Sequence, residues 1–157
     1  MKLELWWIDK TKSSYLEEGI RVFHKRINRF HPLTLQTIKS PVKGKTLSVN
    51  EIKKAEGQTV LSQLTSTDTL ILLDEKGKSM DSKGFATFIE RLRINSHRRV
   101  IFLIGGAYGF SPELYARAQY KIQLSEMTFS HQLIRLIFLE QLYRAMTIIH
   151  NTPYHNT

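Results

Sequence analysis

Residues 100–109 read VIFLIGGAYG, in which an unbroken apolar run, residues 100–104, leads directly into glycines at 105, 106 and 109. A continuous apolar run this short is typical of a β-strand that is buried on both faces, as the strands of parallel sheets are. Residues 69–74, TLILLD, form a second run of the same kind. Together the two runs predict an α/β protein built on a parallel sheet.

Outward from these two runs, short apolar stretches alternate with amphipathic ones along the chain. Ser14 and Ser48 are each followed three residues later by a glutamate, Glu17 and Glu51, and this spacing is the capping-box signature of a helix start. The order of predicted elements is therefore βαβαβαβαβα, with one helix after each strand. The predicted strands are residues 2–8, 33–38, 69–74, 100–104 and 120–124.

The last predicted helix, which starts near Ser130 and runs to about Ile149, is apolar around most of its circumference. A single sheet can cover only one side of a helix. We therefore expect this helix either to form a subunit interface or to lie at the centre of the fold. Glu140 and Arg144, spaced four apart on the same helix, are expected to form a local ion pair.

The chain has 157 residues, with 23 Lys and Arg against 14 Asp and Glu, and a formal net charge of +9. This length predicts one domain over residues 1–157. The absence of cysteine excludes disulfide scaffolds, Cys-ligated zinc and thiol nucleophiles. No stretch approaches the ~20 apolar residues of a membrane span, and the apolar part of residues 1–12 is too short for a signal peptide. We expect a cytoplasmic protein without a membrane segment.

The positive charge is concentrated in residues 21–54, which carry nine basic residues against one acid, Glu51. Such a segment suits a polyphosphate backbone, so we favour a nucleic-acid partner over a merely solvated basic face. Lys43 and Lys45 within it are expected to contact phosphates. A second cluster could extend the patch, and it consists of Arg91, Arg93, His97, Arg98 and Arg99.

Three segments follow the most buried predicted strands, at residues 72–77, 104–109 and 124–129. Because ligands bind at the carboxyl ends of the strands in open α/β sheets, these segments are expected to form one pocket. The glycine spacing in residues 105–109, G-G-x-x-G, differs from the dinucleotide fingerprint. On spacing alone, this loop is as compatible with a tight strand-to-helix turn as with a ligand contact.

Metal and covalent chemistry have little support in the sequence. His131, His150 and His155 lie near the C-terminus, but no carboxylate cluster or H-E-x-x-H spacing accompanies them, so no metal site is expected. Ser111 and Ser125 lack the G-x-S-x-G context of a serine nucleophile.

The C-terminal third carries ordered motifs: Leu124-Ser125-x-Met127-Thr128-x-x-His131-Gln132-Leu133-x-Arg135, then Glu140-Gln141-x-Tyr143-Arg144-Ala145, and Pro153-Tyr154-His155. With Ile104-Gly105-Gly106 upstream, the chain closely resembles, over its whole length, the bacterial ribosomal large-subunit RNA methyltransferase H family. That family belongs to the SPOUT class of S-adenosylmethionine-dependent methyltransferases. It methylates N-3 of a pseudouridine in the helix-69 loop of 23S rRNA on assembled ribosomes.

The resemblance implies a SPOUT-type α/β fold with a C-terminal trefoil knot, and a homodimer packed through helices. Without it, a knot would not be expected. By position, it also implies which residues contact S-adenosylmethionine: Leu73, Gly105, Leu124, Ser125, Glu126, Met127, Thr128 and Phe129. Leu73, Met127 and Phe129 are equally compatible with ordinary core packing.

The acceptor nitrogen of this reaction carries a proton that must leave before or during methyl transfer. The candidate catalytic residues are His155, Tyr154 and Arg135. Tyr154 beside His155 suits stacking on a flipped-out base, and Arg135 could steer RNA or pair with Glu126 inside the pocket. His131 is expected to orient the start of the last helix rather than to act as the base.

Two other functions remain open from the sequence. A non-catalytic RNA-binding or ribosome-associated module would use the glycine loop only structurally. A Rossmann-type nucleotide enzyme is disfavoured because the glycine motif has the wrong spacing and does not follow the first strand.

Overall fold

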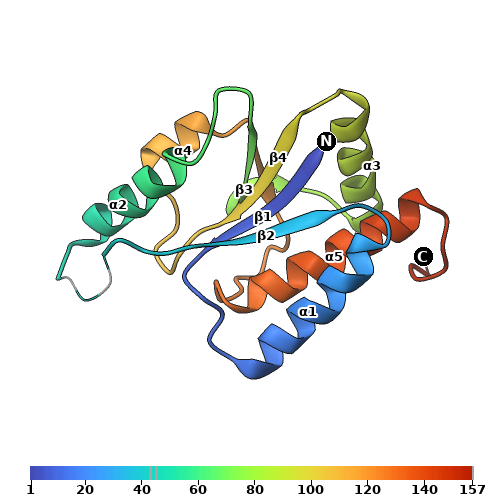
Figure 1. Cartoon of the computed structure of the whole chain (residues 1–157), viewed down its shortest axis with the longest axis horizontal. Coiled ribbons are helices and arrows are strands. Elements are labelled where there is room, and N and C mark those ends of the chain that lie inside the picture. Colours follow the sequence, from blue (N-terminus) through green and yellow to red (C-terminus); the bar gives the residue numbers. More distant parts are fainter. Residues whose placement is uncertain (43, 45, 157) are drawn as a thin grey trace.

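The computed structural model describes residues 1–42, 44 and 46–156. These residues form a five-stranded parallel sheet in the order β2-β1-β4-β3-β5, with helices on both faces (Figure 1). The elements are β1 (Lys2–Ile8), α1 (Ser14–Asn28), β2 (Leu33–Ile38), α2 (Val49–Leu61), β3 (Thr69–Ser79), α3 (Ser82–Ile94), β4 (Arg99–Ile104), α4 (Pro112–Arg117), β5 (Tyr120–Gln123) and α5 (Leu133–Ile149). The predicted parallel α/β architecture is confirmed.

The alternation of side chains along the strands divides the core into two clusters. Leu3, Leu5 and Trp7 of β1 face the cluster that includes residues of α1, α3 and α5. Trp6 and Ile8 face the smaller cluster under α2 and α4, as expected from the two-residue period of a strand. Figure 1 shows the same arrangement, with α1, α3 and α5 on one face of the sheet and α2 and α4 on the other.

Helix α5 lies between α1 and α3 on the larger face of the sheet (Figure 1). Its sheet-facing residues, including Phe138, Leu139 and Leu142, are fully buried. The apolar circumference is thus explained in large part by a central position, one of the two predicted alternatives. The predicted Glu140–Arg144 pair is confirmed, with Arg144 Nη2 donating to Glu140 Oε1 at 2.6 Å.

Helix starts show where capping signals hold and where they fail. Ser48 accepts from Glu51 N at 3.2 Å while the Glu51 carboxylate accepts from Ser48 N, so this capping box is confirmed. The predicted box at Ser14 is wrong, because Ser14 already lies inside α1 and the cap position is Ser13, whose side chain makes no capping bond.

Strand β3 is longer than predicted. It continues past Asp74 to Ser79 and still pairs with β5 there, although the register shifts between Leu73 and Lys78. The predicted turn at residues 72–77 is therefore wrong, since this segment is a strand with a bulge. At the other end of the chain, α5 begins at Leu133, after a turn in which Ile134 N donates to Ser130 O at 3.0 Å. The strand order is compatible with the knot implied by the resemblance, and the knot itself stays a prediction.

Candidate active site

The carboxyl ends of β3, β4 and β5 border a single cleft of about 580 Å³. Its lining comes mainly from residues 73–76, 104–110 and 123–131, and from Lys53 of α2, Tyr115 of α4 and Ile134 of α5. The predicted convergence of three segments into one pocket is confirmed. This volume lies within the ~300–1,000 Å³ of sites that enclose small molecules.

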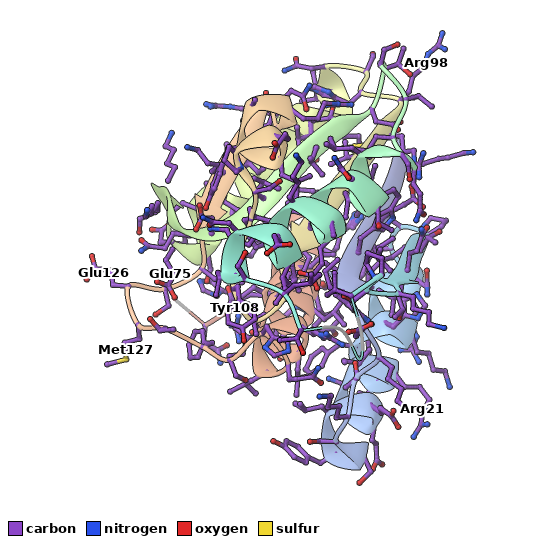
Figure 2. All side chains as sticks on the ribbon, turned by 90° about the vertical axis from the view of Figure 1, so that its left-hand side faces the viewer. Arg21, Glu75, Arg98, Tyr108, Glu126 and Met127 are labelled. Carbon is purple, nitrogen blue, oxygen red and sulfur yellow. The ribbon has the colours of Figure 1, made fainter. Side chains whose placement is uncertain are left out.

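Most of the residues implied as cofactor contacts line this cleft. They are Leu73, Gly105, Leu124, Ser125, Met127, Thr128 and Phe129. Glu126 is absent from the lining, and Figure 2 shows its side chain at the outer edge of the loop, pointing away from the rest of the molecule. Met127 borders the cleft but is 77% exposed, so this loop presents much of its side-chain surface to solvent.

The glycine loop of residues 105–109 makes the tight turn that its spacing allows, and it also lies at the cleft, where a ligand could contact it. Gly109 adopts a positive φ of 84° and donates its N–H to Gly106 O at 3.2 Å, which makes a tight turn. The same glycines line the cleft. A Cβ built on Gly105 would lie 3.1 Å from the Phe110 ring, so a side chain at this position would crowd the wall of the cleft.

Asp74 and Tyr115 were not singled out by the sequence. Both line the cleft, and the Tyr115 hydroxyl lies close to the Asp74 carboxylate. Burial and this carboxylate together raise the pKa of Tyr115 to about 12, so the phenol keeps its proton at neutral pH. Asp74 Oδ2 is buried and has no hydrogen-bond partner within the described part of the chain.

His131 lines the cleft just before the start of α5. Burial, followed by the positive charges of Arg135 and Lys12, lowers the pKa of the imidazole below its ordinary value of 6.5. The side chain is therefore neutral at neutral pH and can accept a proton. The expectation that His131 orients the start of the last helix stays a prediction.

Arg135 in the first turn of α5 is fully buried. Its guanidinium donates to Ile8 O at 2.8 Å, to Asp9 O at 3.0 Å and to Thr11 Oγ1 at 3.0 Å. Burial lowers its pKa to about 10, so it keeps its charge at neutral pH. The expectation that Arg135 steers RNA or pairs with Glu126 is wrong, because its hydrogen bonds tie the segment after β1 to the start of α5.

The C-terminal tail does not reach the cleft within one copy of the chain. Tyr154 donates to Glu140 Oε1 at 3.1 Å, and Arg144 Nη1 lies 3.2 Å from His155 Nδ1. The Arg144 guanidinium also lies over the Tyr154 ring, with Cζ 4.7 Å from its centroid. The tail therefore packs against the second half of α5 (Figure 1), whereas the cleft is lined by residues just before and at the start of that helix.

Burial and Glu140 raise the pKa of Tyr154 above its ordinary value, which keeps the phenol protonated at neutral pH. Tyr154 is thus suited to donate a hydrogen bond and to stack, but not to accept a proton.

The second basic cluster does not extend toward the cleft. Figure 2 shows Arg98 at the top of the view, far from Glu75 and Met127 at its left. Arg99 is bound to Glu4 and Asp68, and it stays a prediction that the other members of this cluster extend the basic patch of residues 21–54. Lys43 and Lys45 of the first basic segment lie outside the described residues.

Over residues 1–42, 44 and 46–156, no group of three or more His, Asp or Glu side chains is arranged to hold a metal ion. Within the same ranges, no helix is both long enough and apolar enough to cross a membrane.

Comparison with known proteins agrees with this arrangement. Residues 1–155 match the family described as "Predicted SPOUT methyltransferase". The ribosomal RNA large subunit methyltransferase H of Parabacteroides distasonis is 45% identical over 99% of this chain and 99% of that protein. The protein of the same name from Cytophaga hutchinsonii is 47% identical over 99% of this chain and 100% of that protein.

Among solved structures, the SpoU methyltransferase AviRb from Streptomyces viridochromogenes aligns with a TM-score of 0.46 and 13% identity over 96% of this chain and 61% of that one. The family match covers residues 1–155, and the relatives are similar over their full length. They show that the chain belongs to the SPOUT methyltransferases, among the ribosomal RNA large subunit methyltransferase H proteins.

Proposed function

We propose that this protein is an S-adenosylmethionine-dependent methyltransferase that modifies N-3 of a pseudouridine in the helix-69 loop of 23S rRNA, on assembled ribosomes in the cytoplasm. The observation that carries this proposal is the cleft at the ends of β3, β4 and β5. It is lined by nearly all the residues expected to contact the cofactor, in a chain similar to rRNA methyltransferases over its full length.

The cleft suits S-adenosylmethionine in size and chemistry. Leu73, Leu124 and Phe129 offer apolar surface for an adenine ring, and the glycines at 105 and 106 allow a ligand to approach the backbone closely. When bound, S-adenosylmethionine supplies an electrophilic methyl group. The chain must then hold the acceptor nitrogen in line with that methyl group, so positioning is its main contribution.

The remaining requirement is an acceptor for the proton of the pseudouridine N-3. His131 meets it, because this imidazole borders the cleft and its lowered pKa keeps it neutral at neutral pH. Arg135 acts as a positioning residue, since its Nε donates to His131 O at 3.2 Å. We assign proton transfer to His131 and the holding of the flipped-out base to Tyr154 and His155.

Tyr154 and His155 can serve a cleft only if that cleft belongs to a second copy of the chain. Leu133, Ile137 and Ile148 form a half-buried stripe on the side of α5 away from the sheet. If two copies pair through this stripe with their α5 helices antiparallel, the end of one helix lies beside the start of the other. A homodimer of this kind would bring each tail to its partner's cleft.

Two kinds of surface would contribute to RNA binding. The basic residues of α1 and of the following segment would contact phosphates, and Arg26 and Arg144 lie beside the aromatic rings of Tyr143 and Tyr154. Cations interleaved with aromatic rings suit an unstacked, single-stranded loop.

Incubation with methyl-labelled S-adenosylmethionine and ribosomes from a strain that lacks this protein tests the proposal. We expect one labelled pseudouridine in the helix-69 loop, located by primer extension and mass spectrometry. If the protein binds ribosomes but transfers no label and does not bind S-adenosylmethionine by calorimetry, it is instead a non-catalytic ribosome-associated module.

Mixing two inactive variants tests the shared site. Gly105→Val disables the cleft and Tyr154→Ala with His155→Ala disables the tail, so neither variant should act alone. After mixing and subunit exchange, heterodimers with one intact cleft served by one intact tail should restore about a quarter of the wild-type rate, because half the dimers are mixed and each has one working site. The absence of any restored activity would show that the cleft and the tail of the same copy work together.

A further inference from the structure

The bulge in β3 directs one carboxylate into the cleft. The pairing of β3 with β5 shifts register between Leu73 and Lys78, and a bulge of this kind turns side chains away from the regular alternation. Gly77 makes the bulge possible, because a Cβ at this position would lie 2.6 Å from the backbone N and C of Ile122. Asp74, at the start of this bulge, lines the cleft as a result.

The Asp74 carboxylate is only partly satisfied by the chain itself. The Tyr115 hydroxyl lies close to it, but Asp74 Oδ2 is buried without a partner among the residues that the structure describes. A buried carboxylate oxygen without a hydrogen bond costs free energy. A ligand that donates an N–H or O–H to Oδ2 would remove this cost.

The charges around Asp74 suggest which part of a methyl donor it meets. Lys53 and Lys76 line the same cleft as Asp74, so the walls carry both an acid and bases. The amino-acid part of S-adenosylmethionine carries an ammonium and a carboxylate, which match this arrangement. The sulfonium has no N–H or O–H to donate. An ammonium adds the attraction of opposite charges to its hydrogen bond with a carboxylate, which a neutral ribose hydroxyl does not.

We propose that Asp74 binds the ammonium group of the methyl donor's amino-acid part, and that Tyr115 holds the carboxylate in place for this contact. This inference rests on the proposed use of S-adenosylmethionine and adds a positioning and specificity role that the motif residues do not supply. Because the demethylated product keeps its ammonium group, Asp74 selects ligands that retain the amino-acid part over adenosine derivatives that have lost it.

Calorimetry with three ligands tests the assignment: S-adenosylmethionine, S-adenosylhomocysteine and 5′-methylthioadenosine, which has the same adenine and ribose but no amino acid. In Asp74→Asn we expect the affinity for the first two ligands to fall about tenfold to a hundredfold, the effect of losing one charge-assisted bond. The affinity for 5′-methylthioadenosine should stay within about twofold of wild type.

Glu113→Gln is the matched control, since it removes the same charge from an exposed residue of α4 that does not line the cleft. It should leave all three affinities within about twofold of wild type, as expected for an exposed charge. If Asp74→Asn weakens all three ligands equally, Asp74 contacts the ribose or supports the cleft as a whole, and the proposal is overturned. Unchanged affinity for every ligand would overturn it as well.

A measurement on the unaltered protein covers the case in which Asp74→Asn fails to fold. An analogue of S-adenosylhomocysteine with hydrogen in place of the amino group should bind about tenfold or more weakly than S-adenosylhomocysteine itself. Equal binding of the two would refute the ammonium contact. If the unaltered protein binds none of these ligands, the proposed methyltransferase function fails first, and the two failures are thereby distinguished.

Discussion

Asp68 and Asp74 lie at the two ends of the buried part of β3, and their surroundings differ sharply. Asp68 is 4% exposed, and its Oδ2 accepts from Thr65 N at 2.7 Å and from Arg99 Nη1 at 3.2 Å. Asp74 also has a buried Oδ2, but that oxygen has no partner in the parts of the chain that the structure describes. The same chemical group is satisfied at the amino edge of the sheet and unsatisfied at the carboxyl edge.

This contrast extends to the neighbours of Asp68. Arg99 also binds Glu4 and lies over the Trp6 ring, with Cζ 5.1 Å from its centroid. Thr69 Oγ1 lies 2.7 Å from His97 Nδ1. Polar groups at the amino edge are thus paired with one another and stabilise the fold, whereas Asp74 Oδ2 at the carboxyl edge is left for a ligand. Four substitutions test this division between the two edges.

The largest expected effect is on stability, at the amino edge. Asp68→Ala leaves the Thr65 N–H without its acceptor and removes one of the two carboxylates bound by Arg99. It should lower the free energy of unfolding by about 3 kcal/mol, because it leaves donors unsatisfied in a largely buried place. Urea denaturation measures this change. The affinity of the remaining folded protein for S-adenosylmethionine should be unchanged, and a parallel loss of affinity would contradict the division.

A smaller effect is expected on the rate of methyl transfer, at the carboxyl edge. His131→Gln should lower kcat about a hundredfold, in the range for the loss of a general base. His131 can accept a proton only while its imidazole is neutral. Because its pKa in the protein is lowered from 6.5, the rate of the wild-type enzyme should fall only when the pH drops through a value below 6.5.

The pH profile of the variant provides the check on His131. Residual activity of His131→Gln should lack the acidic fall attributed to His131. If the variant keeps both the wild-type rate and the wild-type acidic fall, proton transfer belongs to another group, such as His155 of the tail.

The next effect is on cofactor affinity. Gly105→Ala places a Cβ at the wall of the cleft, 3.1 Å from the Phe110 ring, and should weaken S-adenosylmethionine about tenfold through this loss of close approach. Valine would also press on the buried Phe110, so alanine is the sharper test. Gly84→Ala in α3, outside the cleft lining, is the control, and calorimetry should find its affinity unchanged.

The smallest effect on cofactor affinity is expected at Glu126, at the tip of the loop that follows β5. Glu126→Gln should change S-adenosylmethionine affinity by less than about twofold, because this side chain points outward in Figure 2 and an exposed charge contributes little. A loss of tenfold or more in calorimetry would mean that the loop folds inward on binding and that Glu126 belongs to the site after all.

The sequence predicted the parts of this molecule that depend on local chemistry. Buried strands follow from continuous apolar runs such as 100–104, and the Ser48 cap follows from its spacing to Glu51. The convergence of three strand ends follows from the general geometry of parallel sheets. These features need only the identity of nearby residues.

The remaining features depend on contacts between distant parts of the chain. The bulge that aims Asp74 into the cleft is set by the pairing of β3 with β5 and by the close approach of Gly77 to Ile122. Arg135 appeared to be a site residue because its type suits RNA, yet its partners lie more than a hundred positions earlier, at Ile8 and Asp9. Neither relationship leaves a periodic or spaced signal in the sequence.

The attachment of the C-terminal tail to α5 has an energetic consequence. Tyr154 is held by Glu140, and its ring also packs edge-on against Tyr143 at a centroid distance of 4.7 Å. An unattached tail would lose about 1–2 kcal/mol of backbone entropy for each residue ordered on binding RNA. Since folding has already immobilised these residues, recognition of the ribosome starts from a preorganised surface and keeps more of its interaction energy as affinity.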